Sequence, residues 1–244
     1  MAVARAMRPT LAGAALLAAL LAVPRASRAQ ALEVAPVNVL LPAGAMATTL
    51  SVINRGAQPM PIQVRAFAWD QRGGIDHLTR TNDLMVSPPI VVVTPGAAQV
   101  IRLVLRRPAG SVEQAFRILL DQIPPPGAPG IVRIALRLSI PVFAEPAARA
   151  AAALAWRVDG RGAGREVLTA TNRGGAHARI LDPRLSAPNG AKLTVEPDIN
   201  PYVLAGATRR WRIAGRVPPG ARLRLTARTD AGGIDRTVSV AGGP

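Results

Sequence analysis

The sequence contains no cysteine. This absence excludes disulfides, thiol catalysis, zinc sites with cysteine ligands and lipoprotein anchoring through an N-terminal cysteine. It does not exclude export, because an oxidising compartment permits disulfides without requiring them.

Aromatic residues make up only 3% of the chain, and Lys192 is its one lysine. The formal net charge of +16 therefore comes from arginines, which are spread through every segment and do not cluster with aromatic side chains. Nucleic-acid-binding domains usually concentrate their basic residues on one face. We therefore predict no nucleic-acid partner.

Catalytic motifs are also missing. His77 and His177 have no second histidine at metal-ligand spacing, and the chain has no nucleophile elbow, phosphate-binding glycine loop or zinc motif. Asp121 and Glu113 could form a carboxylate pair, but solvated carboxylates at strand ends are the commoner explanation. We predict that the protein is not an enzyme and uses neither a metal nor a cofactor.

The N-terminus has the pattern of a secretory signal. Arg5 and Arg8 precede the apolar run Leu11–Val23, and small residues at Ala29 and Ala31 suit a cleavage site. The run is shorter than the roughly 20 residues of a membrane span, and no later stretch qualifies as one. We expect residues 1–31 to be cleaved and the mature chain to be exported to the periplasm without a membrane span.

The remaining composition favours short strands and turns: 49% of residues are hydrophobic, with 22 glycines and 23 prolines. Short β-rich segments bounded by turn residues follow one another, as in an immunoglobulin-like sandwich. In the first half they are Leu32–Leu41, Thr48–Ile53, Ile62–Trp69, Ile90–Val93, Gln99–Leu105, Phe116–Ile123 and Ile131–Phe143. In the second they are Glu166–Thr171, Ala178–Leu185, Lys192–Val195, Thr208–Ile213, Arg222–Ala227 and Ile234–Val240.

The Ala-rich segment Glu145–Ala153 separates the two groups and could form a short helix. We therefore predict an all-β chain of two immunoglobulin-like β-sandwich domains in tandem. They cover residues 32–146 and 147–244.

The stretch Ile131–Phe143 stands out by its alternation. Val132, Ile134, Leu136 and Leu138 share one strand face. Pro141 cannot donate to a sheet ladder, which favours an edge position, and an apolar edge strand invites aggregation unless something covers it. Periodicity alone leaves two interpretations open: the row faces the protein's own core, or it is covered by another protein.

Four segments follow one another in a distinctive order: Asn54, Ser87-Pro88-Pro89 with Thr94-Pro95-Gly96 and Arg102, Phe116-Arg117-Ile118 through Gln122-Ile123-Pro124, and Ile131–Phe143 with Pro146. Their order and spacing resemble those of the PapD-like family of periplasmic pilus-assembly chaperones. Tyr202–Gly206 and Trp211 resemble the spore-coat-U or archaic variant.

The resemblance implies a mechanism in which the chaperone lends an edge strand to a pilus subunit that lacks its last strand. It implies that Val132, Ile134, Leu136 and Leu138 fill the subunit's groove, and that pilus subunits and an outer-membrane usher are partners.

The family also anchors the subunit's C-terminal carboxylate between two basic residues, and here that pair is not evident. Asn38 stands where the first is expected, and the second falls near Ser139 or Pro141. Arg102, and after it Arg137, are the predicted substitutes, because arginine binds carboxylates bidentately. The alternative function is that of a secreted two-domain subunit or adhesin of a surface fibre. It is disfavoured because the mature N-terminus leads almost directly into the first strand.

Overall fold

The computed structural model describes residues 32–124, 135–160, 166–198, 200–215, 217–218 and 220–242. Within these ranges the chain forms strands and no helix. The predicted signal peptide, and Val132 and Ile134 of the predicted donor row, lie outside the described residues.

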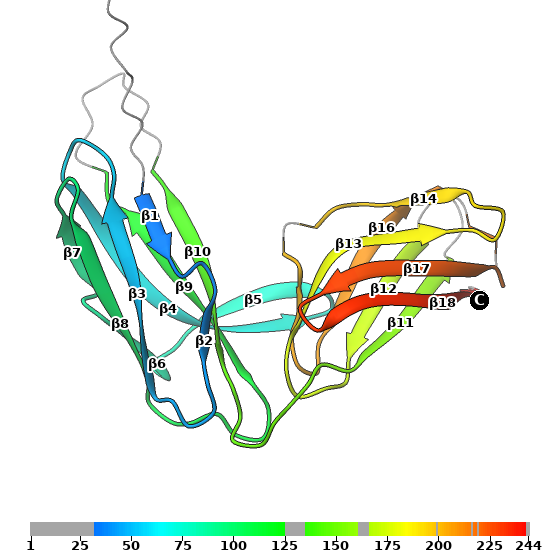
Figure 1. The fold of residues 1–244 in the computed structure, drawn as a ribbon, viewed down its shortest axis with the longest axis horizontal. Helices are drawn as coiled ribbons and strands as arrows, with labels where there is room; N and C mark the ends of the chain where they lie inside the picture. Colours follow the sequence, from blue (N-terminus) through cyan, green and yellow to red (C-terminus); the bar gives the residue numbers. More distant parts are fainter. Residues whose placement is uncertain are drawn as a thin grey trace, which may run out of the picture.

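The first domain packs two sheets against each other (Figure 1). One sheet has the strand order β1 (Leu32–Ala35), β3 (Ala47–Asn54), β8 (Ala98–Leu105), β6 (Leu84–Ser87). The other has the order β2 (Val39–Leu41), β10 (Arg137–Ala144), β9 (Gln114–Gln122), β4 (Met60–Arg72), β5 (Ile75–Arg80), and β7 (Ile90–Val93) also pairs with β4. Alternate residues of these strands form one buried apolar core between the sheets.

The segment Leu32–Leu41, predicted as one strand, is two. β1 pairs antiparallel with β3 in one sheet, and β2 pairs parallel with β10 in the other. Pro36, between them, has no N–H to continue the first ladder. The chain therefore crosses from one sheet to the other at this point.

The second domain is one eight-stranded sheet that closes on itself, because β13 and β14 pair at Leu185 and Leu193. Its core lies inside the closed sheet and is centred on residues such as Leu168, Trp211 and Leu225. The strands are β11 (Leu154–Gly160), β12 (Glu166–Asn172), β13 (Ala178–Ser186), β14 (Lys192–Val195), β15 (Tyr202–Val203), β16 (Thr208–Ala214), β17 (Arg222–Thr229) and β18 (Gly232–Gly242).

Both domains contain the same Asn-Arg-Gly turn with a fully buried asparagine. Asn54 donates from Nδ2 to the carbonyls of Gln58 (2.7 Å) and Val93 (2.9 Å). Asn172 donates in the same way to Ala176 (2.7 Å) and Val203 (3.1 Å). Each side chain satisfies carbonyls that would otherwise be buried without partners.

The linker between the domains, Glu145–Ala153, contains no helix, in contrast to the short helix considered for it. The buried core residues of the first cluster fall within residues 39–144 and those of the second within residues 158–240. The division at residues 146 and 147 remains a prediction. In Figure 1 the two domains meet at one end and enclose an angle.

The hairpin β4–β5 extends from the first domain toward the second (Figure 1). Its turn uses Gly73 and Gly74, both at positive φ (62° and 87°), as a tight hairpin turn requires. The predicted turn at Arg72-Gly73-Gly74 is thus present. β5 itself was missed by the sequence pattern, because its burial is slight and not alternating.

Candidate functional site

In the described part of the chain, one edge of the first domain is left unpaired. β9 pairs with β10 along its whole length, but β2 covers only Val142–Ala144 on the other side. No described strand pairs with that side of residues 137–141, which we call the donor edge. An uncovered edge of this kind can accept a strand from another chain.

The backbone groups of the donor edge point outward at alternate residues. The carbonyl of Leu136 accepts a hydrogen bond from the N–H of Gln122, at the end of β9 (2.9 Å). Because backbone groups alternate in direction along a strand, those of Arg137 and Ser139 point away from β9, toward the open side. Pro141, next in this alternation, has no N–H to offer.

The apolar row on β10 leaves the domain's own core gradually. Ile140 is 4% exposed and belongs to the core, Leu138 is partly buried against it, and Leu136 is 38% exposed. The C-terminal end of the row thus packs in its own domain, as the first interpretation expects, and Leu136 lies exposed beyond that core. That Leu136 and Leu138 contact a partner remains a prediction.

Arg137 lies on the face of β10 opposite to the core. Its guanidinium pairs with Asp121 on β9, which also pairs with Arg65 at 2.6 Å. Burial raises the pKa of Asp121, but the hydrogen bonds from Arg137 and Arg65 outweigh it and hold the pKa below its ordinary value. Arg137, one of the two predicted anchors, is therefore already engaged with a carboxylate.

Arg102, the other predicted anchor, lies on β8 opposite Thr49 and Ser87. This strand belongs to the sheet that does not contain β10. The side chain is exposed, between the core residues Ile101 and Leu103, and so points away from the sandwich interior. Arg102 thus lies on the far sheet from the donor edge, and its role remains a prediction.

Arg117, on β9, pairs with Pro141, the last residue of the donor edge. Its guanidinium carbon is 3.8 Å from the ring centroid of Trp69, and its Nη2 donates to Oδ1 of Asn200 at 3.3 Å. Burial lowers the pKa of Arg117, and no ion pair links it to a carboxylate among the described residues. Asp76 attracts this cation without pairing with it directly. A partly desolvated guanidinium that makes no direct ion pair suits a further carboxylate.

Arg117 was not among the predicted anchors, although its neighbours in the sequence carry a signal. In Phe116-Arg117-Ile118 the arginine sits between two core residues, so it must point to the face opposite the core. That this face meets Trp69 and, in the second domain, Asn200 could not be read from periodicity.

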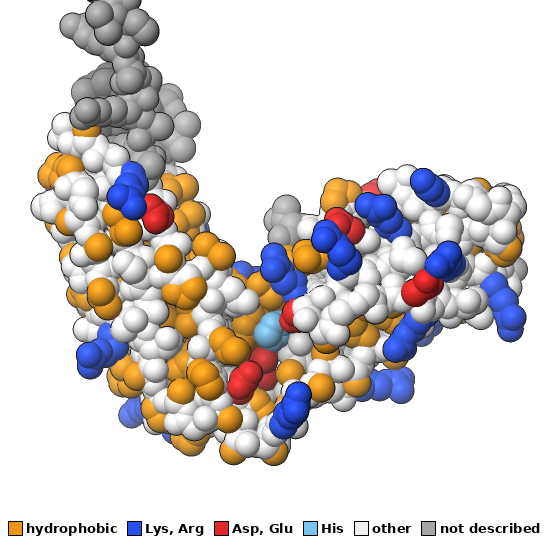
Figure 2. Space-filling view, viewed as in Figure 1, with side chains coloured by type: hydrophobic (Ala, Val, Ile, Leu, Met, Phe, Trp, Pro, Cys, Tyr) orange, Lys and Arg blue, Asp and Glu red, His pale blue; other side chains and the backbone are white. Residues whose placement is uncertain are grey.

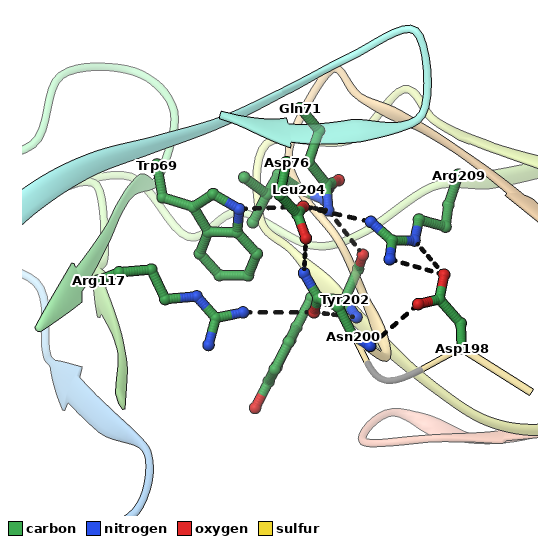
Figure 3. A network of polar contacts seen from close by, with 9 residues as sticks. All are labelled: Trp69, Gln71, Asp76, Arg117, Asp198, Asn200, Tyr202, Leu204 and Arg209. Atoms are coloured by element: carbon green, nitrogen blue, oxygen red, sulfur yellow. Dashed lines mark hydrogen bonds and ion pairs between the residues drawn. The ribbon is translucent and has the colours of Figure 1, made fainter. Parts of the chain in front are cut away.

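The hairpin β4–β5 holds the second domain through paired hydrogen bonds (Figure 3). Gln71 donates from Nε2 to the carbonyl of Tyr202 (3.0 Å) and accepts from the N–H of Leu204 (3.0 Å). Trp69 packs against Tyr202 and Phe143 in a small buried cluster shared by both domains. The angle between the domains is therefore set by specific contacts as well as by the linker.

Asp76, on the same hairpin, is the centre of this network (Figure 3). It accepts hydrogen bonds from Trp69 (3.1 Å), Gln71 (2.8 Å) and Asn200, and it pairs with the buried Arg209 at 3.2 Å. Burial raises the pKa of Asp76, but these donors and the charge of Arg209 outweigh it, so the pKa lies below its ordinary value of 3.8.

Asp76→Asn should lower the free energy of unfolding by about 1–2 kcal/mol at neutral pH, because a partly screened charge-assisted network is lost. A lowered folded-state pKa gives stability above pH 3.8 that disappears as the pH falls through the folded-state value. Urea unfolding of both proteins from pH 7 down to pH 3 should therefore show a constant difference that shrinks only below about pH 4. A difference in unfolding free energy that stays constant down to pH 3 would contradict the lowered pKa of Asp76.

A second contact between the domains joins Glu113 and His177. Nδ1 of the histidine lies 2.8 and 2.9 Å from the two carboxyl oxygens, and both side chains are largely buried. The imidazole stacks on Phe143 with ring centroids 3.6 Å apart. Glu113 and Asp121, considered above as a carboxylate pair, thus have separate partners, and His177 is an interdomain contact.

Among the described residues, no group of three or more histidine, aspartate or glutamate side chains could hold a metal ion. The same ranges contain no helix with the length and apolarity of a membrane span.

Residues 31–150 match the family model described as pili and flagellar-assembly chaperone, PapD N-terminal domain. Comparison with curated protein sequences finds no match.

Solved structures show the same fold over most of this chain. A structure described as the CsuC–CsuE chaperone–tip adhesion subunit pre-assembly complex, from the archaic chaperone-usher Csu pili of Acinetobacter baumannii, has a TM-score of 0.64 at 20% identity and covers 88% of this chain and 100% of that one. The SafA pilin–SafB chaperone complex of Salmonella enterica has a TM-score of 0.59 at 17% identity and covers 88% of this chain and 97% of that one. The Pseudomonas aeruginosa CupB2 chaperone has a TM-score of 0.55 at 19% identity and covers 86% of this chain and 100% of that one. The predicted all-β fold of two immunoglobulin-like sandwich domains is confirmed. In the second domain the pairings β11–β18 and β13–β14 join the two layers of the sandwich into the closed sheet described above.

Proposed function

Because this chain belongs, through residues 31–150, to the PapD family of pili and flagellar-assembly chaperones, we propose that it protects pilus subunits by pairing their open groove with its donor edge. The predicted family and the predicted role as a pilus chaperone are confirmed. The family is one of chaperones and not of enzymes, and we infer that this chain also works by binding alone.

The uncovered side of β10 is the observation that carries the proposal. Residues 137–141 offer outward backbone groups at alternate positions, and a partner strand could pair with them. Leu136, which precedes them in the chain, belongs to the same apolar row but lies exposed outside the domain's own core. Each large apolar side chain buried in a subunit groove would contribute about 1.5–3 kcal/mol before the cost of ordering.

We assign Arg117 as the anchor for the C-terminal carboxylate of the subunit. It lies beside Pro141, where the donor edge ends, and it is a half-buried cation that makes no direct ion pair with a carboxylate in the described part of the chain, although Asp76 attracts it. Arg137 is a weaker candidate because it already shares Asp121 with Arg65. Arg102, on the other sheet, has the least support from its position.

Arg117→Ala should weaken capture of a subunit about 10- to 100-fold, because a charge-assisted contact to a carboxylate is worth roughly 1.5–3 kcal/mol. Arg117→Lys keeps the charge without the planar fork and should recover part of this loss. Affinity is measured by titrating each variant with a subunit released from denaturant, and thermal unfolding checks that the variant is folded. Arg102→Ala is the matched control, and a larger loss for this variant would move the anchor to Arg102.

The partners in this proposal are pilus subunits and an outer-membrane usher. The similar structures include a chaperone with a tip adhesion subunit and a chaperone with a pilin, which supports a partner of the same class here. We propose the periplasm as the location, because the family acts there and because residues 1–31 have the pattern of a cleaved signal.

Co-purification tests the proposal directly. The tagged chain is produced in the periplasm together with the proteins encoded beside its gene, and its bound chains are identified by mass spectrometry. A one-to-one complex with a small secreted β-protein supports the chaperone function. A clean monomer, under conditions in which those neighbours are made, favours the alternative of a fibre subunit or adhesin.

A further inference from the structure

The outer surface of the second domain carries a groove away from the donor edge. Figure 2 shows Lys and Arg side chains spread over this domain, while the first is richer in apolar ones. The groove has a volume of about 380 Å³ and crosses β11, β12 and β16. Its lining residues are Ala155, Trp156, Arg157, Thr169, Thr171, Arg173, Thr208 and Arg210.

Strand register gathers the polar residues on one face. Arg157, Thr169 and Arg210 form one row across the three strands, because Thr169 pairs with both arginines. Thr171 and Thr208 are neighbours in the adjacent row, with their hydroxyl oxygens 3.1 Å apart. The core residues Leu168 and Ala170 point to the opposite side of β12. The floor of the groove is therefore hydroxyl-rich and its two sides are basic.

Thr169 shows that this surface is arranged unlike an ordinary solvated face. The residue is only 4% exposed, although it points away from the core, and its hydroxyl has no hydrogen-bond partner. A buried hydroxyl without a partner costs free energy. Between two arginines, which can only donate, it lacks an acceptor for its proton.

The charges around the hydroxyl are mostly positive. Arg157 pairs with Asp159 through Nε at 2.8 Å, and Arg210 donates to the carbonyl of Gly73 on the hairpin β4–β5 at 3.3 Å. The guanidinium of Arg173 has no hydrogen bond or ion pair among the described residues, only its backbone N–H being engaged. The groove thus holds three guanidinium groups and a hydroxyl donor, with one carboxylate nearby.

We propose that this groove binds an oxyanion of the phosphate class. A tetrahedral oxyanion offers several acceptor oxygens. It would supply the acceptors that the Arg173 guanidinium and the Thr169 hydroxyl lack in the protein alone, and the remaining N–H groups of Arg157 and Arg210 could add to the site. Free phosphate and the phosphate of a lipid headgroup share this chemistry, and experiment separates them.

Isothermal titration with inorganic phosphate at fixed ionic strength tests the site. The protein should bind one phosphate, and Arg173→Gln and Thr169→Val should each weaken binding about tenfold, as the loss of one good contact implies. Arg173 is exposed, so its variant remains informative even if the threonine variant fails to fold. Arg179→Gln, which removes an exposed charge on β13 outside the groove, is the matched control and should bind as the wild type does.

Co-sedimentation with vesicles identifies the source. Binding to phosphatidylglycerol vesicles but not to phosphatidylcholine vesicles, lost in Arg173→Gln and kept in Arg179→Gln, assigns the groove to an anionic lipid headgroup. Phosphate binding without such vesicle binding assigns it to a soluble phosphate. Absence of both, or an equal loss in the control variant, overturns the proposal.

Discussion

Leu136→Arg should abolish capture of a pilus subunit while leaving the chaperone folded. Leu136 is 38% exposed at the point where the apolar row leaves its own core, so the substitution should change the free energy of unfolding by about 0.5 kcal/mol or less. In the complex the same side chain would enter an apolar groove, where an unpaired charge costs several kcal/mol. Affinity should therefore fall by a factor of 100 or more.

Val100→Arg is the matched control. It places the same charge at a solvent-exposed apolar position on β8, in the other sheet of the same domain. Recovery of the subunit on the tagged chaperone is compared for both variants, with thermal unfolding as the check on folding. Equal recovery of subunit by Leu136→Arg and the wild type would remove Leu136 from the donor row.

Glu113→Ala should produce the largest loss of stability at the junction of the domains. The carboxyl group is almost fully buried, and it holds both the ring Nδ1 and the backbone N–H of His177. Its removal leaves those groups buried without a partner, which we expect to lower the free energy of unfolding by about 3–5 kcal/mol. The hairpin β4–β5, the contact of Phe143 with Tyr202 and the linker would then have to maintain the angle between the domains.

Two measurements check this expectation. Urea unfolding should shift to lower denaturant, and small-angle X-ray scattering should show a wider spread of interdomain distances than in the wild type. Glu145→Ala is the control. Glu145 lines the same pocket between the domains as Glu113 and His177, but its side chain is exposed. If Glu113→Ala and Glu145→Ala behave alike, the contact with His177 does not hold the domains together.

Alternation predicted the strands well wherever one face is buried. The segment Gln99–Leu105 appears as β8 with Ile101, Leu103 and Leu105 buried, and Phe116–Ile123 appears as β9 with Phe116, Ile118 and Leu120 buried. A period of two fixes which side chains share a face. It does not state what lies opposite that face, which is why Leu136 and Leu138, equivalent in the sequence, differ in burial.

The candidate anchor could not be predicted, because its neighbours come from elements far apart in the chain. Arg117 meets Asn200, 83 residues away. Asp76 was not among the predicted site residues, yet it contacts Arg209 and Asn200 in the second domain. Periodicity describes one strand at a time, and such contacts depend on the angle between two domains.

Because outward backbone groups alternate along the donor edge, a bound subunit strand can pair with it only in registers that differ by two residues. A guest strand that runs in the direction of β10 and ends with its carboxylate at Arg117 has its terminus fixed beside Pro141. Counting back from that point, even and odd guest residues face opposite sides of the sheet. In a subunit strand with one residue more or fewer before its C-terminal carboxylate, the apolar side chains would face solvent. The anchor would therefore select subunits by the number of residues between the carboxylate and the apolar row, as well as by the carboxylate itself.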